Sequence, residues 1–328
     1  LGLSCHIDLE GDDDYRGRDW SLGCALGGYA LLSDKAGHDR YEGGIGTQGV
    51  GIFGTGMLRD DAGDDFYNAG AFAQGFGSSA GVGVLVDAAG NDVYLAGRED
   101  RDVWRRPSTW VTFAQGSGYS HRFGNQYKDD AGKNRWKITG QIPGGVGMLV
   151  DGGGNDRYEA DVFGQGSAYW YSLGVLVDLG GDDSYRTTWY GQGVGTHAAA
   201  GVLVDVSGND RYHSYNTSQG CGHDFSVGML YDYAGNDHYY AHTLSQGAGN
   251  ALSGLGVLFD RSGDDVYRCR ARSWGFGAPV KGKPPEQQPF GLFLDLGGTD
   301  RYEQNDKAGA GPDKRWNQPP RGYGVDRR

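Results

Sequence analysis

The chain has 328 residues, a formal net charge of −12 and 62 glycines. Binding to nucleic-acid phosphates requires a Lys/Arg footprint, so the acidic balance predicts no nucleic-acid partner. The mean hydropathy is −0.58, and no apolar run approaches the roughly 18 residues of a membrane-spanning helix. We therefore expect no membrane span.

One twelve-residue pattern recurs along almost the whole chain. Its clearest copy runs from Gly147 to Tyr158 and reads GMLVDGGGNDRY, in which the recurring positions are a Leu, two Asp, a Gly and a final Tyr. Most spacings between copies are 26 or 27 residues, and a fixed period of this length indicates a solenoid. The first aspartates of the ten copies are Asp8, Asp34, Asp60, Asp87, Asp151, Asp178, Asp205, Asp232, Asp260 and Asp295.

A glutamine follows the first aspartate by fourteen residues in six of the copies: Gln48, Gln74, Gln165, Gln192, Gln219 and Gln246. Between aspartate and glutamine, residue types alternate with period two between Gly-rich corners, which is typical of strands, and no segment has helical periodicity. By the parity of this alternation, the Leu, the Tyr and the Gln each face inward on one of three short strands. The sequence thus predicts an all-β, single-domain, right-handed parallel β-helix (β-solenoid) of about ten coils with ~27 residues per coil.

The predicted core consists of stacked Leu, stacked Tyr and a ladder of Gln amides that hydrogen-bond to one another along the axis. We assign residues 1–302 to the β-helix, with insertions at about 95–112, 119–143 and 278–289. Residues 303–328 are expected to form an irregular C-terminal tail that caps the last coil, because an open end exposes unpaired strand edges.

The four cysteines, Cys5, Cys24, Cys221 and Cys269, have neither metal-binding spacing nor the density of a disulfide framework. Cys24 and Cys221 occupy the same position of the repeat, sixteen residues after the first aspartate. They are interpreted as buried thiols in one slot of the stack, and a Cys5–Cys24 disulfide is the alternative.

The corner from Gly152 to Tyr158 resembles the calcium-binding nonapeptide of RTX proteins, Gly-Gly-x-Gly-x-Asp-x-large apolar-x. The match covers about eight of every 27 residues; this chain has Asp at the first Gly position, Tyr at the large position and no consecutive nonapeptides. The resemblance implies Ca²⁺ as a cofactor and a secreted, cell-surface or periplasmic location. The rest of the chain resembles bacterial β-solenoid repeat proteins, which implies the fold and no activity. The metal-site candidates are Asp151, Asp156, Asp178, Asp183, Asp205, Asp210, Asp232 and Asp237.

Stacked coils would place each corner aspartate close to its copies above and below. Two like charges 4 Å apart cost about 4 kcal/mol at an effective dielectric of 20, so unneutralised rows of carboxylates would oppose folding. Bound Ca²⁺ is one solution, since calcium prefers oxygen ligands. The alternative is an Asx-turn, in which each first aspartate accepts backbone N–H groups of its own turn. Partial protonation of the carboxylates is a third solution.

Two of the insertions fall in one coil, between Tyr94 and Asp151, and add 37 residues to it. They contain nine Arg or Lys against five Asp or Glu. Loops on a rigid scaffold often carry function, and Arg and Trp dominate binding hot spots. We therefore expect these insertions to bind an acidic protein partner or an anionic polymer, which would make the protein a subunit of a larger assembly. The partner-binding candidates are Arg98, Trp104, Arg105, Trp110, Arg135 and Trp136.

The acids recur equally in every copy, as structural residues do, whereas an active site is singular. The sequence therefore predicts a non-catalytic scaffold or binding module. The alternative is a carbohydrate-active β-helix enzyme, similar to polysaccharide lyases or hydrolases, with its site under the insertions. Such an enzyme requires a cleft in which acids outside the repeat, or a histidine, converge.

Overall fold

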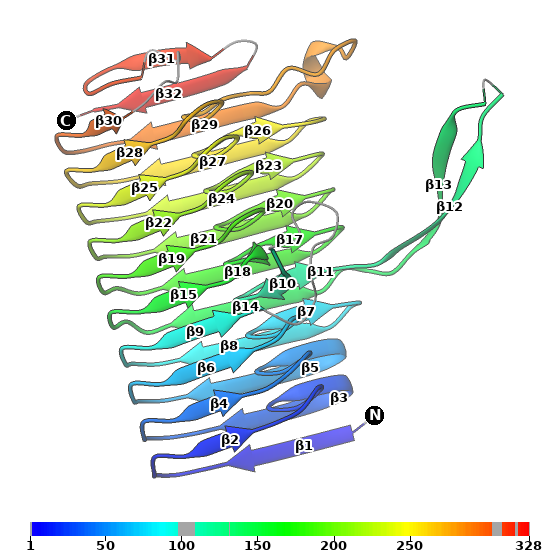
Figure 1. Ribbon diagram of the computed structural model, residues 1–328, viewed down its shortest axis with the longest axis vertical. Helices are drawn as coiled ribbons and strands as arrows, with labels where there is room; N and C mark the ends of the chain where they lie inside the picture. Colours follow the sequence, from blue (N-terminus) through cyan, green and yellow to red (C-terminus); the bar gives the residue numbers. More distant parts are fainter. Residues whose placement is uncertain (1, 98–108, 131, 304–309, 319–320, 328) are drawn as a thin grey trace.

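Three series of short strands repeat along the chain and stack into a rod (Figure 1). The computed structural model describes residues 2–97, 109–130, 132–303, 310–318 and 321–327. The first series has eleven members, eight of which contain the Leu of the repeat: β1 (Gly2–Ile7), β3 (Cys24–Ser33), β5 (Val50–Asp60), β8 (Val82–Asp87), β14 (Val146–Asp151), β18 (Leu173–Asp178), β21 (Ala200–Asp205), β24 (Val227–Asp232), β27 (Leu255–Asp260), β29 (Phe290–Asp295) and β32 (Gly322–Asp326). The exceptions are β1, β29 and β32.

The second series contains the Tyr: β2 (Asp14–Arg16), β4 (Arg40–Glu42), β6 (Phe66–Ala69), β9 (Val93–Ala96), β15 (Arg157–Glu159), β19 (Ser184–Arg186), β22 (Arg211–His213), β25 (His238–Tyr240), β28 (Val266–Arg268) and β30 (Arg301–Glu303). A third series of shorter strands belongs to the same sheet as the first: β7 (Phe76–Ser78), β11 (Gly118–Tyr119), β17 (Ala168–Tyr169), β20 (Gly195–Thr196), β23 (Gly222–His223) and β26 (Gly249–Asn250). Strands β10 (Val111–Ala114) and β16 (Val162–Gly164) form a separate two-stranded sheet. The protein is thus a parallel β-solenoid of about eleven coils, as predicted apart from one further coil, which β32 supplies.

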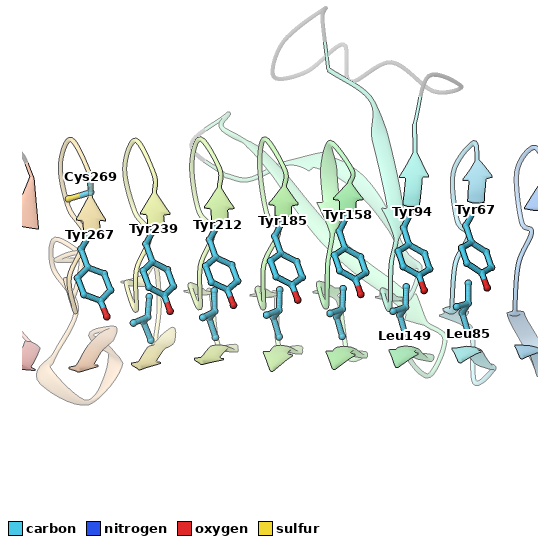
Figure 2. Close-up of a cluster of buried hydrophobic side chains, with 14 of the residues drawn as sticks. Tyr67, Leu85, Tyr94, Leu149, Tyr158, Tyr185, Tyr212, Tyr239, Tyr267 and Cys269 are labelled. Carbon is cyan, nitrogen blue, oxygen red and sulfur yellow. The ribbon is translucent and has the colours of Figure 1, made fainter. Parts of the chain in front are cut away.

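Successive coils pair in parallel with identical repeat positions opposite one another. Leu176 pairs with Leu203 and Tyr185 with Tyr212, and all four side chains are fully buried. The rings of Tyr185 and Tyr212 stack with centroids 4.9 Å apart and planes 3° apart. Figure 2 shows the Tyr and Leu stacks meeting inside the rod. The predicted interior is confirmed, and its register is fixed because a slip of one residue would turn every Leu and Tyr outward.

The glutamines face the interior, but they do not lie on a third strand. Gln192 has φ 62° and the following Gly193 has φ 72°, so the chain makes a left-handed turn there. The turn aims the side chain at the Tyr strands, and Gln192 Nε2 donates to the carbonyls of Tyr185 (3.0 Å) and His213 (3.2 Å) in two successive coils. The predicted amide ladder is therefore wrong, because the glutamines bind backbone carbonyls instead of one another.

The C-terminal end of the rod is covered by the chain itself. Strand β31 (Arg315–Gln318) pairs antiparallel with β32, which continues the Leu sheet in register with β29. Trp316 is buried, packs on Phe293 and Tyr302, and donates its Nε1–H to the carbonyl of Trp274 at 3.0 Å. This contact closes the apolar core at its last coil.

In the described residues, the insertions at 119–143 and 278–289 leave the regular coil. Strands β12 (Arg122–Lys128) and β13 (Asn134–Gln141) form an antiparallel hairpin that projects away from the rod (Figure 1). The short 3₁₀ helix η1 (Pro285–Gln287) lies in the 278–289 insertion. The four cysteines are free thiols, and Cys221 is buried in a cluster with Val194 and Ala248. Within the described ranges, no helix is long and apolar enough to cross a membrane.

Candidate functional site

The first aspartate is buried in every coil from Asp34 to Asp295, and in the six coils from Asp34 to Asp205 it makes two kinds of hydrogen bond. Asp178 Oδ1 accepts the backbone N–H of Gly180 at 2.9 Å, two residues ahead, which is the Asx-turn expected from the sequence. Its Oδ2 accepts the hydroxyl of Tyr158, from the preceding coil, at 2.7 Å. The tyrosine stack thus supplies a donor to the aspartate column, a contact that the repeat pattern did not reveal.

The second aspartate of each coil links coils through the backbone. Asp183 Oδ1 accepts the N–H of Asp156 at 2.6 Å, and the N–H of Asp183 donates to Asp210 Oδ1 at 2.7 Å. The other oxygen of Asp183, Oδ2, is buried and receives no hydrogen bond. The same orphaned Oδ2 occurs in Asp39, Asp65, Asp92, Asp156, Asp210, Asp237, Asp265 and Asp300. Nearly every coil therefore buries one carboxyl oxygen without a donor.

The two aspartates of a coil and the second aspartate of the coil before form a three-carboxyl group. Asp156, Asp178 and Asp183 each contribute one oxygen, and these oxygens lie within 4.8 Å of one another. Nine groups of at least three acidic or metal-ligating side chains occur in the described part of the chain. All eight aspartates predicted as metal ligands are buried in this column, each with at most 2% exposure. These clusters could hold a metal ion.

Burial makes ionised aspartates costly here. It raises the pKa of Asp183 to about 10, with a further contribution from the charge of Asp178. Burial and the charge of Asp205 raise the pKa of Asp178 to about 6, against hydrogen bonds from Tyr158 and Gly180 that lower it. The difference follows from the donors: the first aspartate receives a hydroxyl and an N–H, whereas the second receives only an N–H.

Two arrangements satisfy the orphaned oxygens. One divalent cation per coil would neutralise two carboxylates, and all its protein ligands would be oxygens, as calcium prefers. Without a cation, a proton on the second aspartate would let its Oδ2 donate to the first aspartate. One oxygen of Asp178 and one of Asp183 lie within 4.8 Å of each other, so the two carboxyl groups are direct neighbours.

The structure describes three of the six predicted partner-binding residues. Arg98, Trp104 and Arg105 lie outside the described residues. Arg135 and Trp136 belong to β13 of the projecting hairpin, where they pair with Tyr127 and Gln126.

Trp110, at the end of the first insertion, is half-buried, and its backbone N–H donates to Asp161 Oδ2 at 3.1 Å. It also lines a cavity on the outside of the rod, next to the tyrosine strands. Sequence reasoning missed this cavity, although a change of residue type at one position of the repeat marks it. The third residue after the tyrosine is Gly44, Gly70 or Gly97 in earlier coils and becomes Asp161 and then Thr188.

No protein-family model, no curated protein and no solved structure matches this chain.

Proposed function

We propose that this protein is a non-catalytic scaffold, a rigid β-solenoid that docks an acidic partner through the basic, aromatic insertions of one coil. The observation that carries the proposal is the projecting hairpin β12–β13 (Figure 1). An isolated two-stranded hairpin is marginally stable in water, and contact with a partner would stabilise it.

The exposed side chains of the hairpin suit an acidic partner. Phe123 and Tyr127 are 48% and 49% exposed, and Lys128, Lys133 and Lys137 are exposed as well. Residues 119–143 contain five Lys or Arg against two Asp, within a chain of net charge −12. A basic segment on an acidic rod attracts an acidic protein or an anionic polymer to one place, and aromatic rings add contact area to the interface.

The docking proposal is tested with immobilised poly-L-glutamate as the acidic probe. Replacing Lys128, Lys133 and Lys137 with Glu should abolish retention and leave the melting temperature unchanged, because these side chains are exposed. The matched control reverses three exposed cations elsewhere, Arg211, Lys281 and Lys283.

Retention of the control and loss of the hairpin variant support a local site. Equal loss of retention in both variants would mean that binding depends only on the net charge of the protein, which would contradict the proposal. Deletion of residues 98–110 should also remove binding and leave the rod folded.

We further propose that calcium fills the aspartate column as a structural cofactor. Support comes from the orphaned Oδ2 atoms and from the balance of two carboxylates per coil with one divalent charge. A secreted, cell-surface or periplasmic location belongs to this proposal. Calcium sites of extracellular modules bind with dissociation constants of about 10⁻⁴–10⁻³ M, which is weaker than the binding of cytosolic buffers and sensors.

Removal of calcium with EDTA should then lower the melting temperature, because a ligand that binds only the folded state stabilises it by about 2.7 kcal/mol at a hundred times its dissociation constant. Calcium should restore the melting temperature, and magnesium, which is smaller and loses water reluctantly, should restore less of it. An unchanged melting temperature in EDTA, with no bound calcium in elemental analysis, would contradict the calcium proposal.

The carbohydrate-active alternative requires a pair of free acids in a cleft. The cavity beside Trp110 contains two acids, Glu159 and Asp161. Glu159 forms an ion pair with Arg157 at 2.5 Å, and Asp161 accepts the backbone N–H of Trp110. Both carboxylates thus have structural partners, and this geometry favours a scaffold over a hydrolase.

A further inference from the structure

The hairpin β12–β13 has two outer strand edges, and neither has a neighbouring strand among the described residues. Its strands pair only with each other, in a sheet separate from those of the rod. Figure 1 shows the hairpin projecting away from the coils. An uncovered edge presents unpaired backbone N–H and C=O groups, and a strand of another molecule can pair with them.

The turn of the hairpin shows which backbone groups point outward. The N–H of Asp129 donates to the carbonyl of Lys133 at 3.0 Å, so these two residues form a hydrogen-bonded pair. In an antiparallel ladder such pairs alternate with pairs whose N–H and C=O groups point away from the partner strand. Two pairs of the second kind follow from the register: Lys128 with Asn134, and Gln126 with Trp136. The outer edge of β13 therefore offers the backbone groups of Asn134 and Trp136.

Cations accompany this edge. Lys137 is exposed in the middle of β13, and Lys133 is exposed just before the strand begins. Arg135 stands two residues before Lys137, and alternate residues of a strand belong to the same face. Carboxylates at alternate positions of an added strand would lie opposite these cations, and opposite charges across neighbouring strands stabilise the pairing.

The same charge argues against a second copy of this chain as the added strand. Pairing β13 with β13 of another copy would bring Lys137 and Arg135 next to like charges, which destabilises a sheet. Edge strands commonly avoid pairing with themselves in this way, above all through Lys. Charge complementarity therefore selects an acidic strand.

A cavity lies where β13 ends. Its volume is about 510 Å³, and its walls are Gln141, the last residue of β13, with Ile142, Pro143, Gly144 and Tyr171. Tyr171 comes from the next coil and is 50% exposed. Where a peptide adds a strand to a sheet edge, backbone hydrogen bonds supply affinity, and pockets beside the edge select side chains. The aliphatic and aromatic walls of this cavity suit an apolar side chain.

We propose that the acidic partner is an extended peptide segment that adds a strand to the free edge of β13. Its carboxylates lie beside Arg135 and Lys137, and an apolar side chain occupies the cavity at Gln141. This inference rests on the proposed docking function and narrows the partner from any anionic polymer to a peptide. Strand β13 has eight residues, so the added segment would be about 27 Å long at ~3.4 Å per residue.

The first test uses the full wild-type chain and a peptide of alternating Glu and Val with Leu at each end. Calorimetric titration should show binding. N-methylation of the peptide amides removes the N–H donors and keeps every charge, so it should weaken binding at least about tenfold.

The outcomes separate strand addition from the docking function beneath it. Equal affinities for the plain peptide, the methylated peptide and an inorganic polyphosphate of the same charge would overturn strand addition and leave electrostatic docking intact. Failure of the plain peptide to bind, with the protein still retained on poly-L-glutamate, would have the same meaning. Loss of both kinds of binding would overturn the docking function as well.

Proline variants test which edge is used. Trp136→Pro removes an N–H that faces outward from β13, and Gln126→Pro does the same on β12, so each leaves the hydrogen bonds of the hairpin in place. Trp136→Ala removes the side chain and keeps the N–H. Trp136→Pro should bind the peptide about fivefold more weakly than Trp136→Ala, because a backbone hydrogen bond is lost, and Gln126→Pro should bind like the wild type. Equal affinities of Trp136→Pro and Trp136→Ala, or equal losses in the two proline variants, would overturn the assignment to β13.

Discussion

The variant Asp183→Asn separates two roles of the aspartate column, the hydrogen bonds that it makes and the negative charge that it can carry. In Asp183→Asn, the amide oxygen can still accept the N–H of Asp156, which Asp183 accepts at 2.6 Å. The amide nitrogen would take the place of the orphaned Oδ2 and could donate to Asp178. In cation-free protein we expect the variant to fold at least as well as the wild type, and better at alkaline pH.

The size of the effect follows from the pKa of Asp183. Its value is about 10 in the folded protein against an ordinary value of about 3.9 in the unfolded chain. The proton on Asp183 therefore favours the folded state fully below the unfolded pKa, and this contribution is lost as the pH rises toward 10. Between pH 6 and 9 one retained proton changes the free energy of unfolding by about 4 kcal/mol at most. The asparagine variant should lack that loss.

The assay is urea unfolding in EDTA at pH 6 and pH 9. Asp178→Asn is the matched comparison, because both oxygens of Asp178 accept hydrogen bonds, from Tyr158 and Gly180. An amide nitrogen there removes an acceptor and should cost about 1–3 kcal/mol at both pH values. The reasoning is refuted if Asp183→Asn is as destabilising as Asp178→Asn at pH 9, or if its pH dependence equals that of the wild type.

Three further predictions concern the rod. Leu203→Ala, at a fully buried position, should cost about 2–5 kcal/mol in urea unfolding, and a loss below about 1 kcal/mol would contradict a dry, rigid core. Gln192→Ala removes the donor to the carbonyls of Tyr185 and His213 and should cost about 1–3 kcal/mol in the same assay; a neutral effect would mean that water replaces the amide. In EDTA, the wild-type melting temperature should fall from pH 6 to pH 9, because burial raises the pKa of the second aspartates; a rise would show that these groups are ionised in the folded protein.

The repeat period and the inward positions could be predicted from the sequence alone. Identical residues stack on one another in a solenoid, so the residue opposite Leu176 or Tyr185 is simply the same position of the next copy, Leu203 or Tyr212. Alternation with period two then decides which side chains are buried. The Asx-turn of Asp178 was also accessible, because both of its partners lie within one short turn.

Contacts between different repeat positions were decided only by the tertiary structure. The hydroxyl of Tyr158 reaches Asp178 in the next coil, and the left-handed turn at Gln192 aims its amide at carbonyls of two coils. The cavity beside Trp110 depends on how three coils and the end of an insertion meet. Such distances are set by the width and rise of the coil and by the path of the inserted chain, which a one-dimensional pattern does not encode.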